Sequence, residues 1–184
     1  SEILHLFVGI AATNKEKIMK DFALRMFHES IFDPELQYKA LKAIASMHPE
    51  EISNDYFCKS KDPEVQKIAI LAAGNNGSKE MVDHLLESIN GDSNDTYRVQ
   101  SISRIVYDSK QLLLYVLNRF KDASKKIEKE AIAKVMSHRM DYVMLKLKDE
   151  SFPFISEMIE MMLNLHITED FIDFANRNTD QVIE

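Results

Sequence analysis

The sequence has no tryptophan, one cysteine, four glycines and four prolines in 184 residues. Because turns rely on glycine and proline, their scarcity argues against a loop-rich or all-β fold. The single cysteine, Cys58, excludes an internal disulfide, so we expect a reducing and therefore cytoplasmic location. A lone cysteine in an apolar segment usually behaves as a small buried hydrophobe, and no general base stands out that would activate it.

Long apolar runs are also absent. The longest, residues 3–12, is interrupted by His5, is too short to span a bilayer and lacks the basic flank of a signal peptide. The chain begins with Ser1 rather than methionine, so one interpretation is that it is a fragment of a longer or membrane-tethered protein.

What is present is an ordinary globular composition, with 45% apolar and 29% charged residues, over a length that suits one domain, residues 1–184. Apolar residues recur with the 3.6-residue period of a helix, and no stretch shows sustained strand alternation. In residues 78–89 five apolar side chains share one helical face, opposite charged ones. These five are Met81, Val82, Leu85, Leu86 and Ile89.

Capping residues mark the predicted helix ends. Ser78 is expected to cap the helix that follows it, and Asp62 before Pro63 is expected to cap the preceding helix. Gly74 is expected to end that preceding helix in the left-handed conformation. The short connector between the two helices predicts that they are antiparallel neighbours.

The same reasoning predicts about twelve helices joined by short connectors. Their approximate spans are residues 2–12, 15–29, 34–47, 50–58, 63–73, 78–89, 95–107, 110–121, 124–137, 140–148, 152–164 and 168–176.

The sequence also repeats itself. Residues 33–37 (Asp-Pro-Glu-Leu-Gln) return 29 residues later as residues 62–66 (Asp-Pro-Glu-Val-Gln), and a degenerate copy begins at Asn94. The apolar positions of residues 81–89 shift by 31 onto those of residues 112–120. Such a period is typical of arrays in which each helix pair buries its apolar face against the next pair.

On these residues the sequence resembles HEAT repeats, whose first helix opens with an Asp-Pro-like cap followed by valine, a basic residue and alanines. Residues 62–73 are similar to that pattern, although Gln66 stands where the family often has arginine. The resemblance is best over residues 33–107. It implies an all-α superhelix of about six antiparallel helix pairs, a HEAT-like right-handed solenoid.

The stacked helices should share a continuous core, and the alanines of the first helices allow close approach between neighbours. The residues predicted for this core are Leu41, Ile44, Ile68, Ala69, Ala72, Val82, Leu85, Leu86, Val116 and Leu117.

The sequence has no phosphate-binding glycine loop, no nucleophile elbow and no paired-histidine zinc helix, so we expect no enzymatic activity, no cofactor and no metal site. The best cluster of ligand-type residues is Glu80, Asp83, His84 and Glu87. A firm metal site needs three or four ligands with supporting hydrogen bonds, so a solvated helix face is the better interpretation.

One feature that indicates an interaction surface lies on the second helices, which usually line the concave face of a solenoid. Asp83 is polar, as an exposed position should be. The positions equivalent to it in the next two repeats, 31 and 62 residues later, are Leu114 and Leu145. Tyrosine and arginine are common interface anchors. The predicted partner-binding residues are therefore Leu114, Tyr115, Arg119, Tyr142 and Leu145, unless a cap covers them.

A second feature is charge segregation in a chain whose net charge is −7. Residues 98–148 hold twelve Lys and Arg against five Asp and Glu, whereas both flanks are acidic. Such a block suits an acidic protein, a phosphate-rich surface or an anionic membrane, and the alternative is that the charges only solvate helix faces. The predicted basic patch is Lys125, Lys126, Lys129 and Lys134.

The leading hypothesis is a non-enzymatic scaffold that holds a protein or peptide on the concave face of a helical stack. An alternative is nucleic-acid binding through residues 98–148, as in the HEAT-like alkylpurine DNA glycosylases, although the net acidity and the absence of tryptophan count against it. A lyase like the bilin lyases ranks last, because nothing identifies a pigment site. A cytosolic interaction domain of a membrane-tethered protein is a further alternative.

Overall fold

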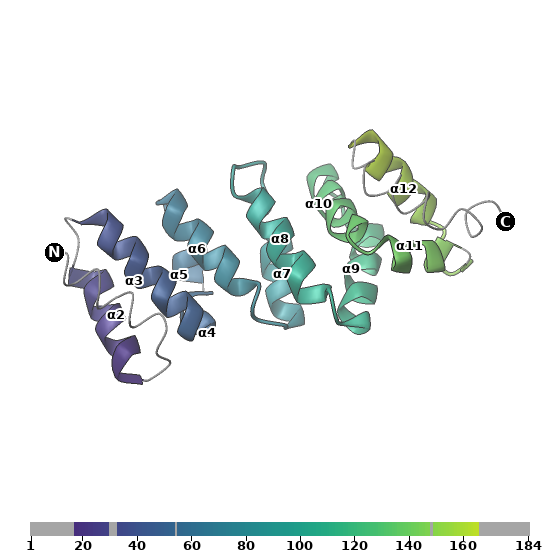
Figure 1. Cartoon of the computed structure of the whole chain (residues 1–184). Coiled ribbons are helices and arrows are strands. Elements are labelled where there is room, and N and C mark those ends of the chain that lie inside the picture. The colour runs from purple at the N-terminus through teal and green to yellow at the C-terminus, as the bar shows by residue number, and fades with distance from the viewer. Residues whose placement is uncertain (1–16, 30–32, 54, 148, 166–184) are drawn as a thin grey trace. The chain divides into compact units, whose positions relative to one another are not determined.

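The structure is a computed structural model that describes residues 17–29, 33–53, 55–147 and 149–165. Over these ranges every regular element is a helix and no strand is present, which confirms the all-α class. The helices, shown in Figure 1, are α2 (Lys17–Glu29), α3 (Pro34–Met47), α4 (Pro49–Ile52), α5 (Asp55–Cys58), α6 (Pro63–Ala73), α7 (Lys79–Glu87), α8 (Asp95–Val106), α9 (Lys110–Asp122), α10 (Lys126–Ser137), α11 (Met140–Leu147) and α12 (Ile155–Asn164). None of them combines the length and the hydrophobicity that a membrane crossing requires.

Most predicted helix boundaries agree with the structure to within a few residues, and the predicted spans 34–47 and 63–73 coincide with α3 and α6. The predicted helices 2–12 and 168–176 lie outside the described residues. Agreement is best where an aspartate precedes a proline, because this pair combines a capping side chain with a backbone angle already suited to a helix.

The single helix predicted over residues 50–58 is wrong. The structure has two short helices there, α4 and α5, and the first begins one residue earlier at Pro49. At Ser53 the backbone leaves helical geometry (φ −78°, ψ 41°) while its N–H still donates to the Pro49 carbonyl. The apolar period continues across this break, so the pattern of residues alone does not reveal it.

Side-chain caps start two helices as predicted. Asp62 accepts hydrogen bonds from the backbone N–H groups of Glu64 (2.9 Å) and Val65 (3.3 Å) at the start of α6. Ser78 accepts one from the N–H of Met81 (3.1 Å) at the start of α7. These side chains satisfy amides that have no partner within the first helical turn.

The left-handed stop predicted at Gly74 is wrong. Gly74 keeps right-handed angles (φ −60°, ψ −11°), and its N–H donates to the Ile70 carbonyl at 3.4 Å. The amides of Asn75 and Asn76 then bond to carbonyls three residues back, so α6 ends in tightened turns that need no positive φ. The glycine that does adopt a positive φ in the described residues is Gly91, at 91°.

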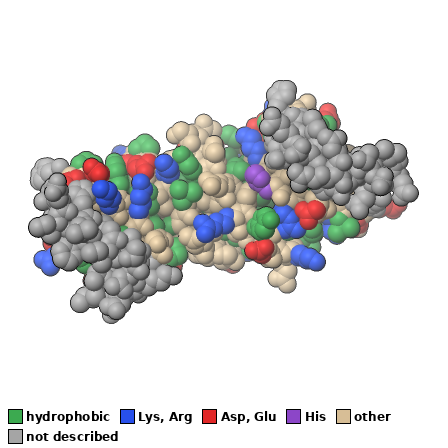
Figure 2. Space-filling view, viewed as in Figure 1, with side chains coloured by type: hydrophobic (Ala, Val, Ile, Leu, Met, Phe, Trp, Pro, Cys, Tyr) green, Lys and Arg blue, Asp and Glu red, His purple; other side chains and the backbone are tan. Residues whose placement is uncertain are grey.

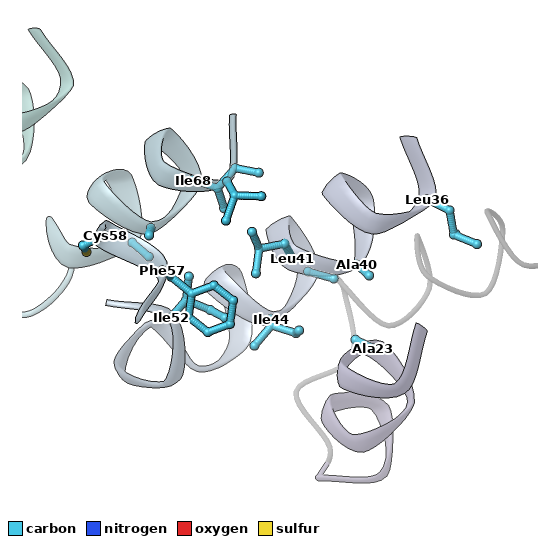
Figure 3. Close-up of a cluster of buried hydrophobic side chains, with 13 residues drawn as sticks. Ala23, Leu36, Ala40, Leu41, Ile44, Ile52, Phe57, Cys58 and Ile68 are labelled. Atoms are coloured by element: carbon cyan, nitrogen blue, oxygen red, sulfur yellow. The ribbon is translucent and has the colours of Figure 1, made fainter. Parts of the chain in front are cut away.

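The chain divides into two compact units, residues 1–77 and residues 78–184. In the first unit α3 packs against α2, α4 and α6. Figure 3 shows the apolar side chains of these helices gathered between them, together with Phe57 of α5. Cys58 belongs to this cluster and is 5% exposed, as expected of a small buried hydrophobe.

In the second unit α10 packs against α7, α8, α9, α11 and α12. Helix α8 begins at the degenerate copy of the repeat that starts at Asn94, and α10 packs between α8 and α12. On α12 the apolar residues Ile155, Met158 and Met162 are buried. Their spacing of three and four residues is that of one core-facing side of a helix.

All ten residues predicted for the core are buried, which confirms the faces that the helical period assigns to the core. They are Leu41, Ile44, Ile68, Ala69, Ala72, Val82, Leu85, Leu86, Val116 and Leu117.

One charged side chain of the second unit is also buried. Arg98 on α8 is 2% exposed, and its Nη1 lies 2.6 Å from a carboxylate oxygen of both Asp92 and Asp95. Burial alone would lower the pKa of Arg98, but the two carboxylates outweigh it and raise that pKa. Asp95 also accepts the N–H of Gly91 at 2.6 Å, so this group fastens the connector between α7 and α8 to the first turn of α8.

Candidate functional site

The predicted partner-binding residues of α9 begin with Leu114. Its neighbour Leu113 is fully buried, whereas Leu114 is 36% exposed. The two consecutive leucines therefore have different roles, because side chains one residue apart on a helix point in directions about 100° apart. Leu113 packs in the core of the second unit, and Leu114 presents apolar surface to solvent.

Tyr115 is half-buried rather than free on the surface. Its hydroxyl donates a hydrogen bond to the carboxylate of Asp83 on α7, and the Lys79 ammonium lies 4.4 Å from the centre of its ring. Burial and this hydrogen bond together raise the pKa of Tyr115 to about 12. The ring is thus held between α7 and α9 by groups of this chain.

Arg119, one helical turn after Tyr115, is also engaged within the chain. Its Nη2 donates to Glu128 on α10 at 2.8 Å, and both side chains are largely buried. Burial alone would lower the pKa of Arg119, but the charges of Glu128 and Asp83 outweigh it and raise that pKa. Tyr115 and Arg119 therefore belong to one polar network that joins α7, α9 and α10.

The two predicted residues of α11 differ in exposure. Tyr142 is half-buried, whereas Leu145 is 69% exposed, the largest exposure among the large hydrophobic side chains that the structure describes. Leu147, which the sequence reasoning did not single out, is 40% exposed. The predicted set thus separates into two exposed leucines, Leu114 and Leu145, and three residues that are at least half-buried.

The predicted basic patch does not form one surface of unpaired charges. Lys126 lies 3.6 Å from Glu130 on the same helix, and Lys129 lies 2.7 Å from Glu157 on α12. Lys125 is exposed at the start of α10, and Lys134 lines a groove farther along that helix. Because Lys129 already neutralises a carboxylate, it contributes little net charge to an outside partner.

Two adjoining grooves between α8 and α10 were missed by the sequence reasoning. The larger has a volume of about 540 Å³ and is lined by Arg104, Tyr107 and His138, among others. The smaller, of about 280 Å³, shares Thr96 and Val99 with the larger groove. Polar residues of α8 line much of them, and no motif in the sequence marks these residues as a binding surface.

Tyr107 is the most exposed aromatic side chain that the structure describes, at 56%. The Arg139 guanidinium lies 5.5 Å from the centre of its ring and donates to its backbone carbonyl. The same guanidinium is bonded to both oxygens of Asp141, each at 3.0 Å. Arg139 therefore holds the end of α8 beside the start of α11, and the Tyr107 ring borders the larger groove.

Within the described ranges, no three or more His, Cys, Asp or Glu side chains come together as metal ligands would. Of the cluster weighed from the sequence, Asp83 is hydrogen-bonded to Tyr115, while Glu80 and Glu87 are exposed.

Comparison of the chain with protein-family models, with curated proteins and with solved structures gives no match. A functional assignment therefore depends on the residues of this chain and their arrangement.

Proposed function

We propose that the chain is a HEAT-like α-solenoid that acts as a non-enzymatic protein-binding scaffold, with the exposed leucines of α9 and α11 at the centre of its binding face. The observation that carries this proposal is the exposure of Leu114 and Leu145, which are 31 residues apart, the spacing of the sequence repeat. Equivalent exposed leucines on successive second helices would offer one partner a row of apolar contacts.

Contacts between helices that begin about one repeat length apart support the solenoid part of the proposal. In the second unit α8 packs against α10 and α10 packs against α12, while in the first unit α3 packs against α6. Their starting residues, for example Asp95 and Lys126, are separated by about one repeat. Within each unit, contact between one repeat and the next is what a linear array of helix pairs requires.

The polar network beside the leucines supports the choice of face. Asp83 holds the hydroxyl of Tyr115, and Glu128 holds the guanidinium of Arg119. Both side chains are therefore fixed in position before a partner binds. Side chains that are already ordered lose less conformational entropy when a partner binds. The aromatic and guanidinium groups then contribute fixed contact area around the exposed leucines rather than free charges.

The test compares two single substitutions with the same change of charge. Leu145→Asp removes a leucine of the proposed face near the end of α11, and Leu163→Asp removes a leucine that is 44% exposed near the end of α12. In a quantitative pull-down from native extract, with circular dichroism as the folding control, we expect Leu145→Asp to abolish recovery of a protein that wild type and Leu163→Asp both retain. Equal recovery by all three proteins would refute the leucine face.

A further inference from the structure

The grooves between α8 and α10 are lined by charged and apolar residues and include neither Leu114 nor Leu145. We propose that these grooves bind an extended acidic peptide segment whose carboxylates contact Arg104 and Lys134 and whose apolar side chains lie between them. This surface is distinct from the leucine face, so it adds a partner class to the proposed scaffold.

The acidic residues of the grooves already have cationic partners in the chain. Asp95 lies 2.6 Å from the buried Arg98, and Glu130 lies 3.6 Å from Lys126. Asp108 interacts electrostatically with Arg139. The pKa of the Arg139 guanidinium is raised mainly by Asp141, and to a smaller extent by Tyr107 and Asp108. The negative charges that border the grooves are therefore at least partly compensated from within.

The basic residues of the grooves are not compensated in the same way. Arg104 on α8 and Lys134 on α10 are both exposed, and neither forms an ion pair with any residue that the structure describes. Figure 2 shows basic side chains and a histidine beside hydrophobic ones on the face over α8 and α10. Such charges are free to attract carboxylates from a partner, and this attraction gives specificity and faster association.

The floor of the grooves is apolar enough to hold side chains between those charges. Val99 is shared by the two grooves, Ile127 and Ala131 line the smaller one, and the exposed Tyr107 ring borders the larger one. Since α8 rises by about 1.5 Å per residue, Val99 lies about 8 Å along the helix from Arg104. Two or three residues of an extended peptide cover that distance.

A peptide suits this surface better than a nucleic acid. Nucleic-acid binding neutralises many phosphates at once, whereas the grooves offer two uncompensated cations and carry the carboxylates of Asp108 and Glu130 on their walls. A continuous run of phosphates would meet those carboxylates, but a peptide with apolar residues between its acids would not.

The experiment measures fluorescence anisotropy of a labelled peptide in which Glu-Ser-Leu is repeated four times, so that its acids are spaced apart, with the complete chain as titrant. A second peptide with Gln-Ser-Leu repeats and a labelled single-stranded DNA are the comparison probes. Wild type is expected to bind the acidic peptide, to bind it more weakly as salt increases, and to bind both comparison probes at least about tenfold more weakly.

Matched double variants locate the site. Arg104→Glu with Lys134→Glu reverses two groove charges, and Lys110→Glu with Lys121→Glu reverses two exposed charges of α9 that line neither groove. We expect the groove variant to lose about tenfold or more in affinity and the α9 variant to change by less than about twofold. Arg104→Gln with Lys134→Gln gives the same comparison with a milder substitution, should the reversed charges prevent folding.

Three outcomes would overturn the proposal. Wild type that does not bind the acidic peptide would exclude it, and equal losses in the groove and α9 variants would mean that only net charge matters. Tighter binding of the DNA, lost in the groove variant, would mean that the surface binds nucleic acid. The Leu145→Asp protein should bind the peptide like wild type, so failure of the leucine face and failure of the grooves are distinguishable.

Discussion

Arg98 and Arg104 lie on the same helix, six residues apart, and have opposite environments. Arg98 is 2% exposed and its Nη1 contacts two carboxylates, whereas Arg104 is exposed and forms no ion pair with a described residue. Six residues turn the helix by about 600°, which places the two side chains on different faces of α8. The comparison teaches that the sequence neighbourhood of an arginine does not decide whether it stabilises the fold or remains available to a partner.

The largest effect on stability is expected from substitution of Arg98, the buried arginine. Arg98→Ala removes a buried cation and leaves Asp92 and Asp95 facing each other without it, so the free energy of unfolding should fall by about 3 kcal/mol or more. Urea denaturation followed by circular dichroism measures this change. A decrease in the free energy of unfolding below about 1 kcal/mol would mean that solvent readily replaces the guanidinium. The contacts of Arg98 with Asp92 and Asp95 would then contribute little to stability.

An intermediate effect is expected at Tyr115, which is half-buried. Tyr115→Phe removes the hydrogen bond to Asp83 and should lower the free energy of unfolding by about 1 kcal/mol at neutral pH, because Asp83 can regain water. Glu80→Gln, an exposed change on α7, is the matched control and should be close to neutral.

The same residue predicts a dependence of stability on alkaline pH. The pKa of Tyr115 is raised from 10.0 to about 12 in the folded protein, so between these values the unfolded chain releases a proton that the folded chain retains. This contribution to stability is complete below pH 10 and is lost as the pH rises toward about 12. Urea denaturation of wild type and Tyr115→Phe across this range should show a smaller loss for the variant, and parallel curves would contradict the prediction.

The smallest effect on stability is expected from substitution of Arg104, the exposed arginine. Arg104→Ala should change the free energy of unfolding by less than about 0.5 kcal/mol, because it breaks no ion pair within the described chain. The same variant should weaken binding of the acidic peptide severalfold, as anisotropy would measure. A destabilisation as large as that of Arg98→Ala would remove the distinction between the two arginines.

Much of the helical architecture could be predicted because its causes are local. The spans of α3 and α6 follow from an aspartate cap, a proline in the first turn and an apolar stripe, all within about a dozen residues. The failures at Ser53 and Gly74 concern how a helix ends, where several backbone conformations satisfy the last carbonyls equally well.

The candidate surfaces could be predicted only in part. The repeat correctly indicated exposed leucines at Leu114 and Leu145, because the 31-residue shift carries an outward position from one helix to the next. It did not indicate that Tyr115 would bond to Asp83, since the two residues are 32 positions apart and meet only when α7 packs beside α9. The grooves were missed for the same reason, because they exist only between α8 and α10.

The sequence by itself determined the helical class and the ten predicted core positions, because burial follows from the periodic placement of apolar side chains. The tertiary structure alone decided which charges are compensated across helices. Lys129 meets Glu157 and Arg119 meets Glu128 across helices, whereas Arg104 and Lys134 meet no acid that the structure describes. Periodicity tells which face a side chain occupies, but an ion pair requires two groups within about 4 Å, and only packing brings distant residues that close.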